Sequence, residues 1–140
     1  MATITTTYLG DMRFRTKLGD HALLIDVPAE MGGQNRGPTP PQLFVASLGS
    51  CVAAFIANYC EKAGIDDSGL AVDVQFDKAE DPTRLVNLGI VIRLPSASCG
   101  HREEALRRVA EHCPVHATIA TLENVSIEIH DRQALLATPA

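Results

Sequence analysis

The N-terminal part of the chain alternates between short β-branched or apolar stretches and Gly-Asp turns. Residues 2–8 are rich in Thr, and residues 12–17 alternate between apolar and polar side chains. Residues 21–27 form a third stretch of this kind, which Pro28 ends. β-Branched and alternating runs separated by tight turns are typical of antiparallel strands. The pattern therefore predicts a three-stranded meander, followed by a loop dense in Gly and Pro.

The central part of the chain predicts one long helix over residues 39–64. Thr39 is a suitable N-cap residue, and Pro40 occupies the first helical position, where its missing N–H has no consequence. Gln42 follows three residues after Thr39, which gives a capping box. Gly64 can adopt the left-handed conformation that ends a helix.

This helix has no charged residue between Leu43 and Tyr59, and its apolar side chains point in every direction. A helix at a protein surface has one polar face, so we expect this helix to be buried nearly all round. A membrane span is the alternative. The apolar run is shorter than the roughly 20 residues that a span needs, and small or polar residues interrupt it, so we expect no membrane association.

The C-terminal part of the chain predicts two strands, a second helix and a last strand. Period-two alternation indicates strands over residues 70–76 and 85–94. Helical spacing of apolar residues, with arginines on the opposite side, indicates an amphipathic helix over 101–113. Alternation returns in 124–130, which we expect to be a strand. The order βββ-α-ββ-α-β predicts an α+β fold with mainly antiparallel sheet and a long central helix, in a single domain over residues 1–140.

Composition excludes several classes of partner. The chain has 140 residues and a formal net charge of −5, and it contains no Trp. It therefore lacks the basic patch and the stacking aromatics that nucleic-acid binding requires. The N-terminus has no basic segment followed by an apolar run, so we expect no signal peptide and a cytoplasmic location. In that compartment the four cysteines stay reduced unless their chemistry is redox chemistry.

Two of the four cysteines are the candidates for chemistry. Cys51 lies in the middle of the long helix among small residues, which leave room for a reactant to reach its sulfur. A small buried side chain with no reactivity is the alternative interpretation of Cys51. Cys113 lies where the second predicted helix meets Pro114. Cys60 and Cys99 are expected to have no catalytic role.

A metal site is a competing interpretation of the second cysteine. His112, Cys113 and His116 offer three ligands within five residues, and Cys51 could be a fourth. The spacing is not that of a zinc knuckle, and the chain has no Cys-x-x-Cys pair. Phosphate-binding loops are also absent from the sequence. We therefore expect neither a metal nor a cofactor.

Three segments together resemble the OsmC/Ohr family. The segment 37–51, Gly-Pro-Thr-Pro-Pro-Gln-Leu-Phe-Val-Ala-Ser-Leu-Gly-Ser-Cys, is similar to the central-helix motif of that family. Residues 113–116, Cys-Pro-Val-His, are similar to its second-cysteine motif, and residues 28–33 resemble the segment that leads into the helix. The resemblance implies an intertwined homodimer with two cysteine sites at its interface.

The resemblance also implies an activity. Members of the family reduce organic hydroperoxides with a reactive cysteine, which corresponds to Cys51, and a resolving cysteine, which corresponds to Cys113. A dithiol reductant then restores both thiols. Sulfenic acid formation followed by condensation with a second thiol is a reversible route of this kind. We therefore expect a thiol peroxidase that acts in oxidative-stress defence.

Activation of the reactive thiol is where the chain departs from the family. A thiol in the middle of a helix gains little from the helix dipole, and in the family an Arg held by a Glu lowers its pKa. Pro41 occupies the position of that Glu here, and the next residue, Gln42, is neutral. Arg36 is our first candidate for the Arg, and Arg13 and Arg15 remain alternatives.

The substrate pocket is expected to include residues from the central helix and one residue after the second cysteine: Gln42, Phe44, Ser47, Phe55 and His116. A different class of function stays open beside the peroxidase. The same pocket in a dimer could sense redox state or bind a small apolar ligand without catalysis.

Overall fold

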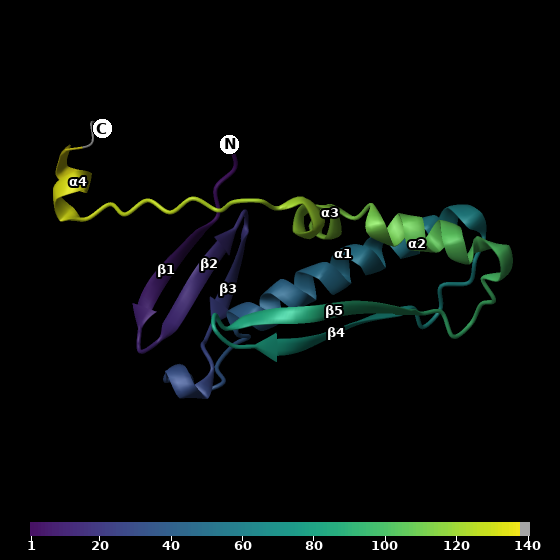
Figure 1. Cartoon of the computed structure of the whole chain (residues 1–140), viewed down its shortest axis with the longest axis horizontal. Helices are drawn as coiled ribbons and strands as arrows, with labels where there is room; N and C mark the ends of the chain where they lie inside the picture. The colour runs from purple at the N-terminus through teal and green to yellow at the C-terminus, as the bar shows by residue number, and fades with distance from the viewer. Residues whose placement is uncertain (138–140) are drawn as a thin grey trace.

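A long helix, α1 (Pro40–Ala63), runs through the centre of the molecule, and the other elements are arranged around it (Figure 1). In this computed structural model, which describes residues 1–137, the predicted start and stop of the helix are both confirmed. Pro40 is the first helical residue, and Gln42 Oε1 accepts a hydrogen bond from the backbone N–H of Thr39 at 2.9 Å. Gly64 ends the helix with a φ of 69°.

Two separate antiparallel sheets accompany the helix. The first is the predicted meander, and its strand order is β1-β2-β3. The second is a hairpin of two longer strands, β4 and β5, in which Val74 pairs with Ile90. The strands are β1 (Thr5–Gly10), β2 (Arg13–Leu18), β3 (His21–Ile25), β4 (Ala71–Ala79) and β5 (Arg84–Arg93). The α+β class with antiparallel sheets and a long central helix is thereby confirmed.

The hydrophobic core lies between α1, the β4-β5 hairpin and the helices that follow it. Its buried members from α1 are Leu48, Val52, Ile56 and Cys60, which recur every four residues along one side of the helix. α2 (Glu103–Glu111) adds Leu106 and Ala110. Gly49 permits the close approach of α1 to the hairpin, because a Cβ at this position would lie 3.3 Å from Val74 Cγ2.

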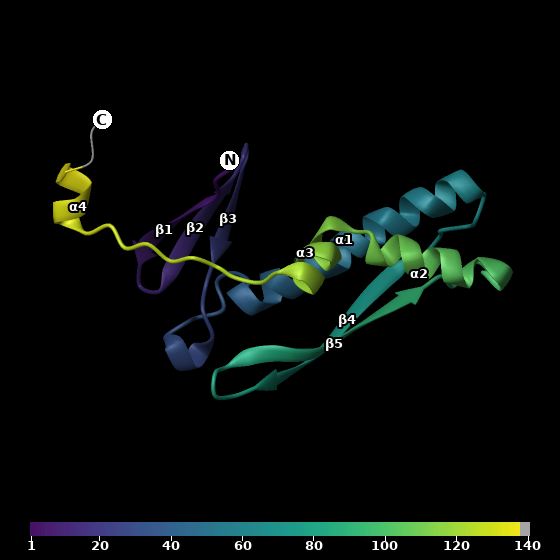
Figure 2. The same cartoon turned by 45° about the horizontal axis from the view of Figure 1, so that its top comes forward.

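The meander adds no buried residue to this core within residues 1–137. It lies next to the N-terminal end of α1, at the opposite end of the molecule from α2 (Figure 2). The loop between β3 and α1 folds back against the end of β3, where the N–H of Asp26 donates to Pro38 O at 3.2 Å. Gly33 is required in that loop, because a Cβ there would coincide with the carbonyl of Val27.

The second half of the chain differs from the sequence-based expectation in three places, of which two concern helices. The predicted helix 101–113 is a 3-10 turn (Gly100–Arg102) followed by α2, and a further helix, α3 (Pro114–Thr121), begins directly after Cys113. A short helix, α4 (Arg132–Ala137), was not predicted. Pro114 starts α3 because the first helical position needs no N–H.

The predicted strand 124–130 is wrong for the single chain. The segment runs extended between α3 and α4, but it pairs with no strand in residues 1–137 (Figure 1). Its alternating apolar side chains face solvent, and Ile127 and Ile129 are 86% and 88% exposed. Alternation indicates a strand only where a partner strand is present, and this chain alone supplies none.

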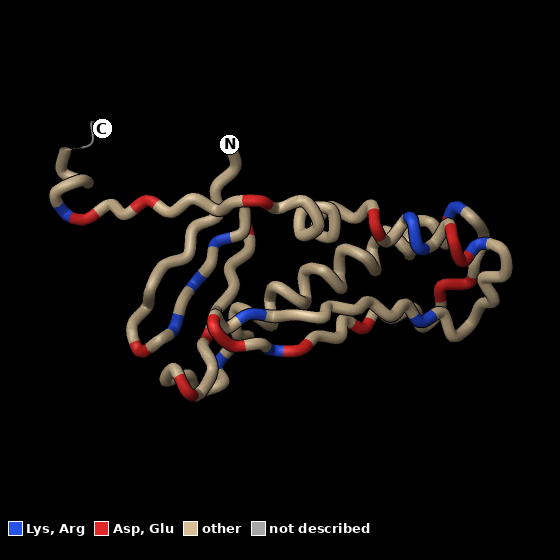
Figure 3. The backbone as a smooth tube through the Cα atoms, in the orientation of Figure 1, with Lys and Arg blue, Asp and Glu red and all other residues tan. Residues whose placement is uncertain are grey.

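The expectation that α1 is buried nearly all round is also wrong for the single chain. The tube in Figure 3 shows no charged residue along most of the helix, as the sequence indicates. However, Phe44 and Phe55 are 45% and 37% exposed. By length and composition α1 could cross a membrane, a test that the core helix of a soluble protein also passes. One uncharged face of α1 is thus left uncovered in the single chain.

Candidate active site

Cys51 lies at the edge of the uncovered face of α1. Phe44, Ser47, Cys51 and Phe55 are spaced three or four residues apart and therefore follow one stripe of the helix. The neighbouring stripe, with Leu48 and Val52, faces the core. Cys51 is partly buried and packs against that core, so its sulfur lies where the apolar interior meets the uncovered face.

Cys113 belongs to the hydrophobic core and is fully buried. It is the N-cap residue of α3, and its Sγ accepts a hydrogen bond from the backbone N–H of His116 at 3.2 Å. The thiols of Cys51 and Cys113 are close enough to interact. α3 packs against α1, and this contact brings together two cysteines that are far apart in the sequence.

The surroundings of Cys113 favour its neutral thiol. Burial raises the pKa of Cys113 above its ordinary value, because the apolar core solvates a thiolate poorly. The N–H of His116 opposes this increase by stabilising the thiolate, and the neighbouring Cys51 thiol adds to it. The net effect is a thiol that stays protonated at neutral pH.

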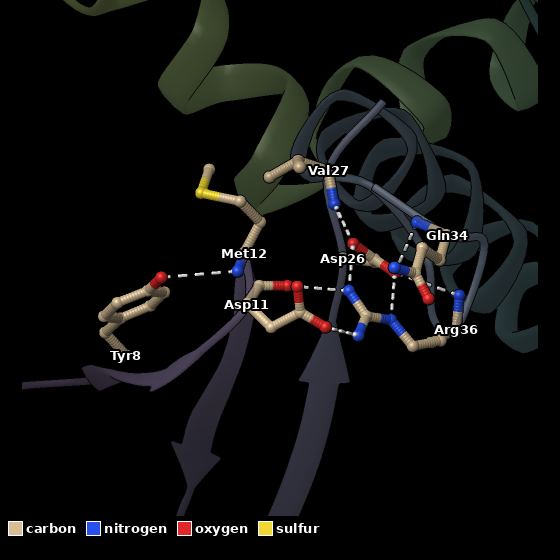
Figure 4. A network of polar contacts seen from close by, with 7 residues as sticks. All are labelled: Tyr8, Asp11, Met12, Asp26, Val27, Gln34 and Arg36. Atoms are coloured by element: carbon tan, nitrogen blue, oxygen red, sulfur yellow. Dashed lines mark hydrogen bonds and ion pairs between the residues drawn. The ribbon is translucent and has the colours of Figure 1, made fainter. Parts of the chain in front are cut away.

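Arg36 is held between the carboxylates of Asp11 and Asp26 (Figure 4). Its Nε donates to Asp26 Oδ2 at 2.8 Å, and its Nη1 donates to Asp11 Oδ2 at 2.8 Å. Asp26 is completely buried and also accepts backbone N–H bonds from Val27, Gln34 and Arg36. The Arg36 guanidinium and these N–H groups hold the pKa of Asp26 well below its usual range. No contact described for Arg36 in residues 1–137 reaches Cys51.

The two other candidate arginines lie on β2. Arg13 differs from Arg36 because its Nε is buried and has no hydrogen-bond partner in the part of the chain that the structure describes. Arg15 is exposed on the same strand. Of the three arginines considered from the sequence, Arg13 is therefore the one with a buried guanidinium nitrogen left to bind a further group.

The expected pocket residues are only partly gathered in one place. Phe44 and Ser47 share the stripe of Cys51, and Ser47 Oγ donates to Phe44 O at 2.7 Å. Phe55, on the same stripe, borders a shallow groove between α1 and α2 together with Tyr59 and Val109. The side chain of Gln42 is occupied by the helix start. His116 lines a different cavity, between β5 and α2.

The described residues contain no group of three or more His, Cys, Asp or Glu side chains placed to hold a metal ion. His112 Nδ1 lies 2.6 Å from Arg108 O. Cys113 faces the core instead, and His116 lines the cavity beside α2. The three residues considered as ligands from the sequence therefore have different surroundings.

Asp26 was not singled out from the sequence, although a signal was present. It is the one charged residue within the run Ala-Leu-Leu-Ile-Asp-Val of residues 22–27. A buried carboxylate in such a run requires a charged or hydrogen-bonding partner, and Arg36 is that partner here.

Comparison with known proteins identifies the class to which this fold belongs. Residues 33–130 match the family described as OsmC-like protein, which is more than half of the chain. The chain therefore belongs to the OsmC-like protein family. No curated protein sequence matches it significantly.

Solved structures agree with this assignment. A Psychrobacter arcticus protein described as an osmotic stress induced and detoxification response protein is 26% identical, with a TM-score of 0.74 over 84% of this chain and 88% of its own. An OsmC-like protein from Mycoplasma pneumoniae is 20% identical, with a TM-score of 0.69 over 86% and 87% of the two chains. The organic hydroperoxide resistance protein OhrB of Bacillus subtilis is 21% identical, with a TM-score of 0.57 over 86% and 92%.

Proposed function

We propose that this chain is a cytoplasmic thiol peroxidase that reduces organic hydroperoxides in oxidative-stress defence. The observation that carries the proposal is the pairing of a partly exposed Cys51 with a fully buried Cys113 across the contact of α1 and α3. The family supports it, and so does the name of the Bacillus subtilis relative, an organic hydroperoxide resistance protein.

The proposed reaction has three steps. The Cys51 thiolate attacks the terminal oxygen of the hydroperoxide, the O–O bond breaks, and the alkoxide takes a proton to leave as an alcohol. Cys51 is then a sulfenic acid. The Cys113 thiol condenses with it, which forms the disulfide and releases water. A dithiol reductant exchanges with this disulfide, so that both cysteines return to thiols and the reductant is oxidised.

The surroundings of the two cysteines support this division of roles. Cys51 borders the uncovered apolar face, which an organic hydroperoxide can approach. Cys113 is fully buried and its pKa is raised, so it is a poor initial nucleophile. It can still attack the sulfenic sulfur of Cys51, because that partner lies beside it and the core excludes competing reactants.

Arg36 remains the first candidate for the group that activates Cys51, and Arg13 is the alternative that the structure adds an argument for. Asp26 and Asp11 hold Arg36 as the carboxylate holds the arginine in the family, but none of the contacts described for Arg36 in residues 1–137 reaches Cys51. Arg13 retains a buried nitrogen without a partner among residues 1–137. A carboxylate at position 41 is not available to hold it, because this chain has Pro41 there.

Two copies of the chain are needed to complete the fold in this proposal. The uncovered face of α1 and the unpaired apolar segment 124–130 are both surfaces that a second copy can bury. An intertwined homodimer would cover the stripe of Phe44, Cys51 and Phe55 and enclose the thiols in an apolar pocket. Exchange of an extended segment between two copies is a common route to such dimers.

Single cysteine variants test the proposal. After one equivalent of cumene hydroperoxide, mass spectrometry of the parent should show a loss of about 2 Da, from one disulfide. Cys51→Ser should not react, because a Ser hydroxyl with no base beside it is a weak nucleophile. Cys113→Ser should gain about 16 or 32 Da on Cys51, as the sulfenic or sulfinic acid. Cys99→Ser is the matched control and should turn over within a few-fold of the parent.

If the parent keeps Cys51 as a free thiol after this treatment, the reductase is ruled out. The alternative would then take its place: a dimeric module that senses redox state or binds a small apolar ligand on the uncovered face of α1. Exposure of Phe44 and Phe55 beside Cys51 is the observation that favours this second candidate.

A further inference from the structure

Two cysteines outside the proposed reaction lie at the same end of the molecule. Cys60 is in the last turn of α1, and Cys99 is in the segment between β5 and the 3-10 turn that precedes α2. The β4-β5 hairpin brings these two segments together, because Ala71 at the start of β4 pairs with Arg93 at the end of β5. The end of α1 and the start of α2 accordingly lie at the same end of the molecule in both views (Figures 1 and 2).

Contacts on both sides of Cys99 hold its segment in this place. After it, Arg102 donates from Nη1 to the carbonyl oxygen of Ala63 at 3.4 Å, and the N–H of Arg102 donates to the carbonyl of Cys99 at 3.0 Å. Before it, Pro95 lies so close to Gly69 that a Cβ at position 69 would be 2.9 Å from the proline Cγ. The segment is therefore tied to the last turn of α1 and to the residues that follow this helix.

The two cysteines also contact the same hydrophobic core. Cys60 is completely buried within it, and Cys99 is partly buried and packs against it. Cys99 in addition lines a cavity of about 510 Å³ between β5 and α2, which is large enough to admit a small oxidant. One accessible thiol and one buried thiol thus lie at this end of the core, as Cys51 and Cys113 do elsewhere in it.

Cys99 lies near enough to influence the ionisation of Cys60. Burial raises the pKa of the Cys60 thiol above its ordinary value, and the nearby Asp67 and Cys99 raise it further. Cys60 therefore stays protonated at neutral pH and is a poor first nucleophile. It cannot pair with Cys51, because nine residues of helix separate the two by roughly 13 Å along the axis.

We propose that Cys60 and Cys99 form a second disulfide when the chain meets an excess of hydroperoxide. The Cys99 thiolate attacks the terminal oxygen, the O–O bond breaks, and the leaving oxygen takes a proton and departs as an alcohol, or as water from hydrogen peroxide. The Cys60 thiol then condenses with the sulfenic acid of Cys99, which forms the S–S bond and releases a second molecule, water. A dithiol reductant restores both thiols by exchange.

This disulfide protects Cys99 and is separate from peroxide turnover by the first pair. A sulfenic acid without a thiol partner is oxidised further to sulfinic acid, which thiols do not reduce. Disulfide formation requires Cα atoms roughly 4.4–6.8 Å apart. All four cysteines are free thiols in the structure, and Cys99 lies in a segment without helix or strand, whose backbone can adjust to this distance.

Peptide mapping of the folded full chain tests the proposal. The reduced protein is treated with roughly ten equivalents of cumene hydroperoxide, the remaining thiols are alkylated, and chymotryptic peptides are analysed without reduction. Chymotrypsin cuts after Phe55 and Tyr59 and so places the two cysteines of α1 in different peptides. We expect the Cys60 peptide joined to the Cys99 peptide with a loss of about 2 Da, and dithiothreitol should separate them.

Variants identify the roles of the two thiols. Cys99→Ser should leave Cys60 as an unoxidised thiol, and Ser98→Ala, at the neighbouring exposed position, is its matched control and should keep the link. Cys60→Ala should leave Cys99 without a partner, so that Cys99 gains about 32 Da as the sulfinic acid. Circular dichroism first establishes that each variant is folded, and Cys99→Ser with its control decides the matter if Cys60→Ala is not.

Cys51→Ser separates this proposal from the peroxidase. The link between Cys60 and Cys99 should form in this variant at a rate within about threefold of the parent, because the first pair is not needed for it. Its absence there would overturn the proposal. So would Cys99 that stays a free thiol or becomes sulfinic acid in the parent while Cys60 remains reduced, or a Cys99 peptide joined to Cys113 or to Cys99 of a second copy.

Discussion

The backbone N–H of His116 points at Sγ of Cys113, 3.2 Å away, so that the buried cysteine is also the N-cap of α3. The sulfur is thereby fixed by the helix that follows it, and α3 in turn packs against α1. A change at either helix will alter the position of this sulfur relative to Cys51. The same hydrogen bond is too weak to offset burial, which dominates the pKa of the Cys113 thiol.

Cys113 should therefore be alkylated slowly at neutral pH. Its pKa is raised above the ordinary value of 9.0, so that the thiolate is the minor form at pH 7. In Cys51→Ser, the rate of Cys113 alkylation by iodoacetamide should increase with pH and reach half of its maximum above pH 9. A midpoint near pH 7 would contradict this assignment and would make Cys113 a candidate for the attacking thiol.

Asp26 should stabilise the fold above about pH 4 and lose this effect in acid. Its pKa is depressed in the folded chain, so the stabilisation is present above the unfolded-state pKa of roughly 3.9 and is lost as the pH falls below it. Asp26→Asn should lower the Tm by roughly 5 °C or more at pH 7, because Arg36 then loses its buried partner.

The control for Asp26 is Asp11→Asn, which removes the exposed partner of the same arginine and should change the Tm little. The Tm difference between Asp26→Asn and the parent should also decrease as the pH is lowered from 5 to 3. A difference that stays constant over this range would mean that the carboxylate charge contributes nothing.

Replacing Arg13 and replacing Arg36 should change different properties: the reactivity of Cys51 in one case and the Tm in the other. If Arg13 activates the thiol, Arg13→Ala should slow alkylation of Cys51 at pH 7 by roughly threefold to tenfold. Arg36→Ala should mainly lower the Tm, because it leaves the buried Asp26 without its ion pair. The measurement is alkylation kinetics from pH 5 to 9 beside thermal denaturation. The reverse pattern would support Arg36 in the role expected from the sequence.

The homodimer should be detectable in solution. Light scattering at micromolar concentration should give twice the 15.0 kDa of one chain. Ile127→Lys should shift the distribution toward monomer, because Ile127 is 86% exposed in the single chain and a charge there would oppose its burial against a second copy. Glu128→Lys, at the neighbouring exposed position, is the matched control and should remain dimeric. A parent of 15.0 kDa at this concentration would rule out the dimer.

The sequence predicted the elements that depend on local signals. The capping residues Thr39, Pro40 and Gln42 and the terminating Gly64 define α1 without reference to the rest of the chain. The alternation in β4 and β5 is likewise local, and the hairpin supplies its own partner strand. The segment 124–130 shows the same alternation but needs a partner that the single chain does not contain. Periodicity alone does not distinguish these two cases.

Long-range contacts could not be predicted from the residues. The interaction of Asp26 with Arg36 depends on how the Gly-rich loop folds back, which no local pattern in the sequence indicates. The proximity of Cys51 and Cys113 was inferred only from a family resemblance. No pattern in the sequence indicated the cavity beside His116, because its lining comes from β5, α2 and the segments on either side of α2.

Gly33 has a consequence for how this gene can change. A Cβ at this position would coincide with the Val27 carbonyl, so the loop that positions Arg36 depends on the absence of any side chain there. Every single-base change in a glycine codon either keeps glycine, introduces a residue with a Cβ, or ends the chain. Codon 33 can therefore accept synonymous mutations but no replacement, however conservative, without displacing the loop between β3 and α1.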